Sequence, residues 1–174
     1  MWTITDSPVG ELRLVAAGEA LVGIDFLGGL PTDGVESVSV ARHAARAGGL
    51  PLDERCDTDP LLREASGQLA AYFTGGLREF DLPLAPAGTT FQLSVWEQLR
   101  QIRYGETASY GEVARRLGLT GHGARAVGLA NGRNPIPVVV PCHRVVGASG
   151  SLTGYGGGIA RKQQLLDLES ERLF

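Results

Sequence analysis

The sequence predicts an α+β protein with an antiparallel N-terminal sheet and a mostly helical C-terminal domain. Three stretches rich in β-favouring residues, 2–5, 11–16 and 20–27, follow one another with only short turns between them. From residue 59 onward the apolar residues recur mainly at helical spacing. A proline- and glycine-rich segment at 84–88 separates the two patterns, which places the domains at 1–88 and 89–174.

In the N-terminal half the three stretches form a meander, with turns at Asp6–Gly10 and at Gly18-Glu19. A helix starts at Asp59-Pro60, where Asp is an N-cap and Pro the first helical residue, and it ends at Gly75-Gly76. Its apolar stripe comprises Leu61, Leu62, Ala65, Leu69, Tyr72 and Phe73. The alternation at Phe80–Leu84 predicts a fourth strand.

The segment from Gly28 to Asp57 is interpreted as a long surface excursion with one weak helix near Val40–Ala47. His43 and Cys56 lie within it and are interpreted as solvated loop residues. We expect neither to take part in chemistry.

Charge is distributed unevenly between the halves. Residues 1–88 carry 6 Arg and 13 acidic residues, a balance of -7, whereas residues 89–174 carry 10 basic and 6 acidic residues, a balance of +4. Of the sixteen cations only Lys162 is a lysine. An arginine-rich surface suits forked contacts to phosphate, although a GC-rich genome also explains the bias.

The C-terminal half predicts a helix-turn-helix unit. A helix capped by Thr89 or Thr90 runs to Tyr104-Gly105. Next, Ser109 and Glu112 form a capping box, and the turn at 121–123 leads into a helix of small residues, 124–132. Arg125 is the only long cation of that second helix, and the other side chains are mostly small. The helix therefore suits close approach to a narrow groove better than reading of base edges in the major groove. The alternative is a helix packed inside the domain.

Cys142 follows Val138–Val140, which we interpret as a short strand buried on both faces and ended by Pro141. Cysteine attacks as a thiolate, and the adjacent His143 or a nearby cation such as Arg144 can favour that form. The alternative is that Cys142 is a small buried apolar residue. Beyond it, the glycine-dense loop 147–158 allows backbone to approach a ligand, or is an ordinary flexible loop.

Several classes of protein are excluded by composition. No apolar run approaches the ~20 residues of a membrane span, and the N-terminus has no signal pattern, so we expect a cytoplasmic protein without a membrane partner. Two cysteines in unrelated contexts do not predict a disulfide framework. Three histidines and two cysteines at scattered spacings do not predict a metal site.

Taken together, these motifs closely resemble those of the O6-alkylguanine-DNA alkyltransferases. The resemblance covers about Thr89 to Glu169, and the N-terminal half agrees in element order, which implies a ribonuclease H-like domain there. Its motifs are Pro141-Cys142-His143-Arg144-Val145-Val146, Asn134-Pro135, Ala124-Arg125-Ala126-Val127-Gly128, Tyr104-Gly105-Glu106-Thr107, Ser109-Tyr110, Gly154-Tyr155 and Gly157-Gly158.

The resemblance implies a role for each matching residue in the chemistry. Cys142 would accept the alkyl group, His143 would be its base through a water, and Glu169 would orient His143. Tyr110 would rotate the phosphate and donate to the guanine. We expect one turnover per molecule, because the product is a thioether, and no cofactor.

Recognition of DNA is implied in the same way. Arg125 would replace the flipped nucleotide in the stack, and Ala124 and Ala126 beside it would lie against double-stranded DNA that contains O6-alkylguanine or O4-alkylthymine. Asn134 resembles a hinge residue. The pocket for the base would comprise Asn134, Pro137, Val145, Tyr155, Gly156 and Gly157, and we expect the protein to act as a monomer.

Three features depart from the family pattern. Arg103 stands where many members have proline, residues 1–50 lack the cysteines of the zinc-binding members, and Gly156 offers only its backbone. The competing hypothesis is a non-catalytic protein of the alkyltransferase-like type that binds alkylated DNA, but those proteins have tryptophan in place of Cys142. A cysteine hydrolase and a plain helix-turn-helix regulator explain fewer of the motifs.

Overall fold

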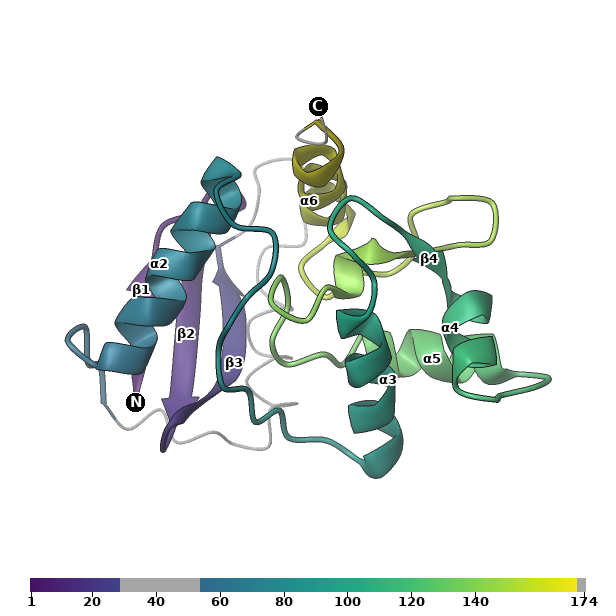
Figure 1. The fold of residues 1–174 in the computed structure, drawn as a ribbon, viewed down its shortest axis with the longest axis horizontal. Helices are drawn as coiled ribbons and strands as arrows, with labels where there is room; N and C mark the ends of the chain where they lie inside the picture. The colour runs from purple at the N-terminus through teal and green to yellow at the C-terminus, as the bar shows by residue number, and fades with distance from the viewer. Residues whose placement is uncertain (29–53, 172–174) are drawn as a thin grey trace. The chain divides into compact units, whose positions relative to one another are not determined.

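The computed structural model describes residues 1–28 and 54–171. The chain divides into two compact units, Met1–Ala87 and Gly88–Phe174 (Figure 1). The predicted helix near Val40–Ala47, His43 and most of the predicted excursion lie outside the described residues. Cys56 is described and half-buried.

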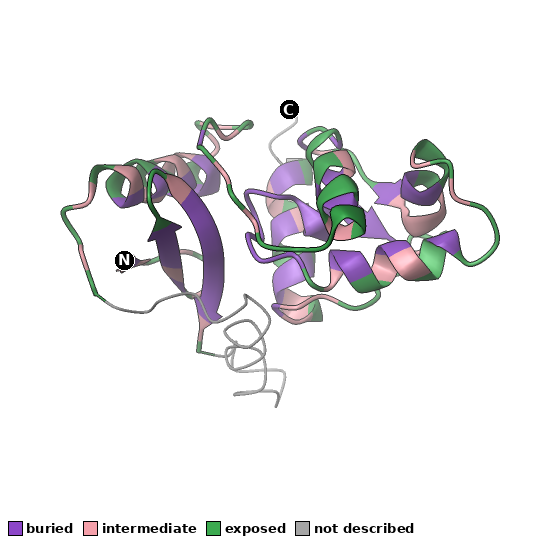
Figure 2. Ribbon diagram, turned by 90° about the horizontal axis from the view of Figure 1, so that it is seen from below, coloured by how far each residue is buried: buried purple, intermediate pink, exposed green. Residues whose placement is uncertain are grey.

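The first unit contains a three-stranded antiparallel sheet in the order β1-β2-β3, formed by β1 (Trp2–Thr5), β2 (Glu11–Ala17) and β3 (Ala20–Leu27). The predicted meander is therefore confirmed. A bulge between Val15 and Ala16 shifts the register of β2 against β3. Strands β2 and β3 are largely buried, as Figure 2 shows, whereas β1 is mostly half-buried.

Helix α2 (Pro60–Thr74) packs on this sheet. It begins as predicted, because the Asp59 side chain accepts a hydrogen bond of 2.9 Å from the Leu62 N–H. It ends at Gly75, whose φ of 81° is the left-handed cap that glycine adopts readily. The residues that it buries are Leu62, Ala65, Leu69, Tyr72 and Phe73.

The strand predicted at Phe80–Leu84 is wrong. Only Leu84 forms an isolated bridge, with Leu21 of β3. The two hydrogen bonds there run from Leu21 N to Pro83 O, 2.8 Å, and from Ala85 N to Leu21 O, 3.0 Å. Pro83 has no N–H to donate, which prevents the pairing from continuing as a ladder.

The second unit is mostly helical. Its elements are α3 (Thr90–Arg100), β4 (Ala108–Ser109), α4 (Tyr110–Arg116), α5 (Gly123–Asn131), the 3₁₀ helix η1 (Cys142–Arg144), β5 (Val145–Val146) and α6 (Ile159–Glu171). The two short strands β4 and β5 pair in parallel. With the sheet of the first unit, this confirms the α+β class.

Helices α4 and α5 pack together as the predicted helix-turn-helix unit. The capping box is formed, since Ser109 Oγ accepts from Glu112 N at 3.1 Å and a Glu112 carboxylate oxygen accepts from Ser109 N. Trp96 of α3 also holds α5, because its indole N–H donates 2.9 Å to the Ala130 carbonyl. Within the described residues no helix is long and apolar enough to cross a bilayer.

The strand predicted at Val138–Val140 is also wrong. These residues form a turn, in which Val140 N donates 2.9 Å to Ile136 O and Val138 has a φ of 74°. Within the described residues, Val138 is the only non-glycine residue with a positive φ. The interpretation failed because three buried valines satisfy a packed turn as well as a strand.

Candidate active site

Cys142 is held at the end of the turn by the Asn134 side chain. The amide Nδ2 of Asn134 donates 2.8 Å to Val140 O, and its Oδ1 accepts 3.0 Å from Ile136 N. Cys142 N then donates 2.8 Å to Val140 O. The cysteine therefore begins η1 on a rigid backbone, and only 4% of its surface is exposed.

The Cys142 thiol is protonated at rest. Burial raises its pKa to about 11, although hydrogen bonds from Asn134 and Tyr155 and the charge of Lys162 act in the opposite direction. The thiol must therefore lose its proton while it reacts. A base has to be available beside it.

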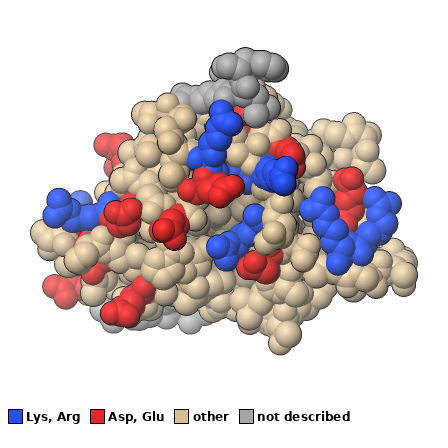
Figure 3. All heavy atoms as spheres, in the orientation of Figure 1, with Lys and Arg blue, Asp and Glu red and all other residues tan. Residues whose placement is uncertain are grey.

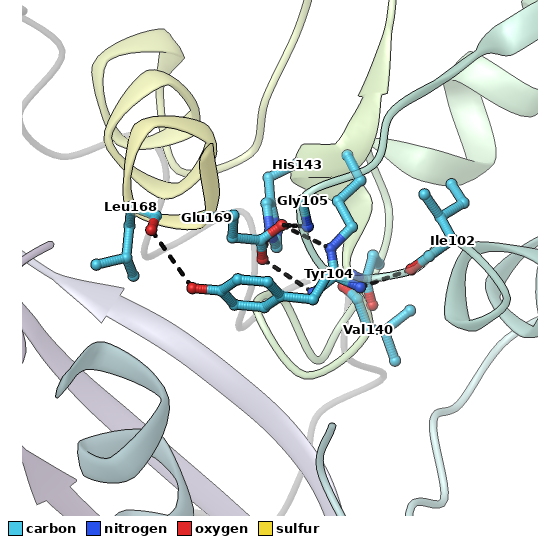
Figure 4. A network of polar contacts seen from close by, with 9 residues as sticks. Ile102, Tyr104, Gly105, Val140, His143, Leu168 and Glu169 are labelled. Atoms are coloured by element: carbon cyan, nitrogen blue, oxygen red, sulfur yellow. Dashed lines mark hydrogen bonds and ion pairs between the residues drawn. The ribbon is translucent and has the colours of Figure 1, made fainter. Parts of the chain in front are cut away.

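His143, the next residue, is fully buried and faces Glu169 of α6. Its Nε2 lies 2.9 Å from Glu169 Oε1 (Figure 4). Burial, with the charges of Arg144 and Lys162, lowers the pKa of His143 despite the opposing effect of the Glu169 carboxylate, so the ring is neutral and able to accept a proton. Its Nδ1 has no hydrogen-bond partner among the described residues.

Glu169 accepts hydrogen bonds from residues that lie far from it in the sequence. Arg144 donates from Nε to Oε2 and from Nη2 to Oε1, both at 2.9 Å, and Gly105 N donates 3.2 Å to Oε2. Burial would raise the pKa of Glu169, but the hydrogen bonds from His143 and Arg144 and the charge of Arg144 outweigh it and hold the pKa below its usual range. The carboxylate is therefore charged, and it fixes the His143 ring.

Arg144 has a different role from the one predicted. The sequence predicts a cation near the thiol. In the structure the guanidinium donates to the Glu169 carboxylate through Nε and Nη2, and its Nη1 donates 2.6 Å to Ile102 O. The cation that acts on the thiol is Lys162 of α6. It is fully buried and donates to Val145 O at 2.6 Å and to Thr153 O at 3.0 Å.

Lys162 was missed as a site residue. Its hydrogen-bond acceptors are backbone carbonyls, which every residue has, so no residue type in the sequence identifies them. The signal that could have found it is its isolation as the only lysine in the chain. Asn131 was missed as well, although it is buried and its Nδ2 lies 3.4 Å from the Cys142 carbonyl.

Tyr110 joins the site from the start of α4. Its hydroxyl donates 3.2 Å to Thr153 O, and Lys162 Nζ lies 5.9 Å from the centre of its ring. Thr153 O thus accepts from both Tyr110 and Lys162. This hydrogen bond places Tyr110 against the glycine loop.

The predicted pocket residues are buried to different degrees. Asn134, Pro137, Val145 and Gly157 are buried, whereas Tyr155 and Gly156 are half-buried. Gly157 O accepts 3.0 Å from Arg161 Nη1, and Val145 O is the acceptor of Lys162. The loop is therefore anchored to α6 through Arg161 and Lys162. Among the described residues no cluster of His, Cys, Asp and Glu could hold a metal ion.

The predicted DNA-contacting residues lie on α5. Ala124 and Arg125 are exposed and Ala126 is half-buried. The neighbouring α4 adds Arg115 and Arg116 in its last turn. Figure 3 shows basic side chains gathered around an acidic one over α4, at the right of the view.

Comparison with known proteins gives two family models. Residues 90–171 match the 6-O-methylguanine DNA methyltransferase, DNA binding domain, and residues 1–86 match the ribonuclease-like domain of the same methyltransferase.

Curated relatives and solved structures agree with the family models. A methylated-DNA-protein-cysteine methyltransferase of Methanosarcina acetivorans is 45% identical, over 97% of each chain. One of Mycobacterium tuberculosis is 48% identical over 96% of this chain and 90% of its own. The crystal structure of Mycobacterium tuberculosis OGT in complex with DNA is 46% identical, with a TM-score of 0.79 over 98% of this chain and 93% of that one.

A more distant structure, the O6-methylguanine-DNA methyltransferase of Pyrococcus kodakaraensis, is 28% identical and has a TM-score of 0.65 over 97% of this chain and 99% of that one. The sequence motifs, the fold and the comparisons agree, and the chain belongs to the methylated-DNA-protein-cysteine methyltransferase family.

Proposed function

We propose that this protein repairs O6-alkylguanine in double-stranded DNA by taking the alkyl group onto Cys142 Sγ, once per molecule. The observation that supports this proposal is the neutral ring of His143, the residue after the buried Cys142. The Glu169 carboxylate fixes this ring, and its Nδ1 has no partner among the described residues. A base that a water can link to a protonated thiol supplies the thiolate that an in-line attack on carbon needs. O4-alkylthymine, which presents a similar alkoxy carbon, is the proposed second substrate.

The reaction moves one proton and one alkyl group. His143 takes the thiol proton, with a water as the carrier, and the sulfur forms a bond to the alkyl carbon as the bond from carbon to O6 breaks. The electron pair of the broken bond stays on the guanine, to which Tyr110 donates a hydrogen bond. The guanine takes up one proton from water and His143 releases the proton that it took from the thiol, so that both rings end neutral. The thioether that remains on Cys142 cannot be reduced by a thiol, so the protein does not turn over.

Base flipping follows from the burial of the thiol. Cys142 is 4% exposed, and O6 lies inside the duplex, so the nucleotide must leave the stack to react. We assign Arg125, with Ala124 and Ala126, to the DNA-facing side of α5, where Arg125 takes the position of the extruded base. Asn134, Pro137, Val145, Tyr155, Gly156 and Gly157 form the pocket, and the active species is a monomer.

The test is mass spectrometry of the intact protein after incubation with a duplex that contains O6-methylguanine. One methyl adduct on a peptide containing Cys142 is expected, and Cys142→Ala should bind the duplex but gain no adduct. Protein supplied at less than one equivalent should repair only its own molar amount. Repair beyond one group per chain, or binding without any adduct, would contradict the proposal, and the second result would indicate the alkyltransferase-like alternative.

A further inference from the structure

A stripe of three exposed residues runs along α5 and just past its end. Arg125, Leu129 and Arg133 follow one another at intervals of four residues, and all three are exposed. Leu129 is 60% exposed, more than any other large hydrophobic residue that the structure describes. The opposite side of the helix buries Val127, Ala130 and Asn131.

The stripe extends past α5 because the helical backbone continues beyond Asn131. Gly132 keeps right-handed helical angles, and Arg133 N donates 3.1 Å to Ala130 O. Eight residues at helical rise place the two arginine backbones about 12 Å apart, with the leucine between them. The stripe therefore presents an apolar side chain flanked by two cations.

The positive charge of this stripe indicates a negatively charged partner. Helix α5 contains no acidic residue, so nothing on it neutralises Arg125. A second copy of the chain would bring like charges together, whereas a nucleic acid offers phosphates to both arginines. In the minor groove the deoxyribose edges between the phosphates are apolar, and minor-groove proteins insert apolar side chains, leucine among them, between base steps from that groove.

We propose that Leu129 packs against the deoxyribose wall of the minor groove, while Arg133 pairs with a phosphate further along the strand. This inference rests on the proposed function, in which α5 faces the DNA. Leu129 contributes an apolar, salt-independent part of the affinity for duplex, separate from the contact assigned to Arg125. It acts on binding and not on the transfer step.

The test compares Leu129→Asn with a matched control, Leu93→Asn, which changes an exposed leucine of α3 that is 41% exposed. Single-turnover transfer is measured against duplex concentration at several salt concentrations. Leu129→Asn should raise the half-saturating duplex concentration about tenfold, leave the limiting rate constant unchanged and keep the same salt slope. Leu93→Asn should change none of these quantities.

Arg133→Ala should lower the magnitude of the salt slope by about 1, because it removes one phosphate contact. Thermal unfolding of each variant checks that an exposed substitution leaves the fold intact.

The inference is overturned if Leu129→Asn saturates at the parent's duplex concentration, or if it lowers only the limiting rate constant. A self-association of the parent that Leu129→Asn abolishes, seen by sedimentation without DNA, would assign the leucine to a second copy instead. Failure of the underlying function looks different, because the parent would then transfer no alkyl group and Arg125→Ala would bind duplex normally.

Discussion

At the scale of single residues, the site depends on how a buried carboxylate is satisfied. Glu169 is 1% exposed and contacts His143, both nitrogens of the Arg144 fork and the Gly105 N–H. A buried charge is tolerated only when its lone pairs are all engaged. Arg144 therefore positions the His143 ring indirectly, by holding the Glu169 carboxylate that contacts this ring.

Replacement of Arg144 by lysine tests this role. Lysine keeps the charge but cannot form two hydrogen bonds to Glu169 and a third to Ile102 O, so the free energy of unfolding should fall by about 1–3 kcal/mol. Transfer should also slow, since the His143 ring is less firmly oriented. Chemical denaturation and single-turnover transfer measure the two effects, and Arg100→Lys on the exposed face of α3 is the control. Equal stability of Arg144→Lys and the parent would show that the fork is dispensable.

The depressed pKa of Glu169 makes stability depend on acid. The folded pKa lies below the ordinary value of 4.5, so its stabilising contribution is fully present above pH 4.5 and is lost as the pH falls through the folded pKa. We expect stability to fall below pH 4.5, and Glu169→Gln to reduce that fall while lowering stability at neutral pH. Denaturation at a series of pH values measures this. An unchanged slope in Glu169→Gln would contradict the assignment.

Sequence reasoning finds Cys142 and His143 because they are adjacent within a distinctive motif. It assigns Arg144 to the wrong partner, because the arginine reaches a carboxylate 25 residues further along the chain. It misses Lys162 because the bonds of that side chain end on backbone carbonyls, which every residue possesses. Contacts of this kind are determined only by the tertiary fold.

At the scale of elements, signals confined to a few residues predict the structure well. Asp59 and Ser109 form the caps that the sequence indicates, because a cap depends on neighbours within one helical turn. The prediction of a strand from Val138 to Val140 is wrong because this conformation does not depend on neighbours within one turn alone. The conformation of this segment depends on the Asn134 amide, which bridges Ile136 and Val140 and holds the chain in a turn.

The positive φ of Val138 leads to a prediction about this turn. Glycine in an ordinary conformation costs roughly 0.5–1 kcal/mol relative to alanine, but at φ 74° an L side chain is strained by about 1 kcal/mol or more. Val138→Gly should therefore be at least as stable as Val138→Ala, although both lose the same buried side chain. The pair Val139→Gly and Val139→Ala should show the usual order, with alanine more stable.

Equilibrium denaturation of the four variants measures these differences. Because each comparison is made between glycine and alanine at one position, the cavity left by the valine largely cancels. The same order at both positions would show that the Val138 backbone is unstrained.

At the scale of the whole molecule, the uneven charge makes a prediction about DNA binding. The net charge of -3 opposes binding, but the second half of the chain carries a balance of +4 and matches the DNA-binding family model. Attraction to DNA should therefore come from that half alone. Its exposed cations include Arg115, Arg116, Arg125 and Arg133.

If the protein makes on the order of three to five phosphate contacts, the logarithm of the binding constant should fall with the logarithm of salt concentration with a slope of roughly -3 to -4.5. Arg116→Ala should lower the magnitude of that slope by about 1, because it removes an exposed cation of α4, the helix that packs against α5. Arg63→Ala, an exposed arginine on α2 of the acidic half, is the matched control and should leave the slope unchanged. Fluorescence anisotropy with an unmodified duplex at several salt concentrations gives all three slopes. A slope near zero, or an equal effect of the two substitutions, would mean that the DNA does not bind along the basic half.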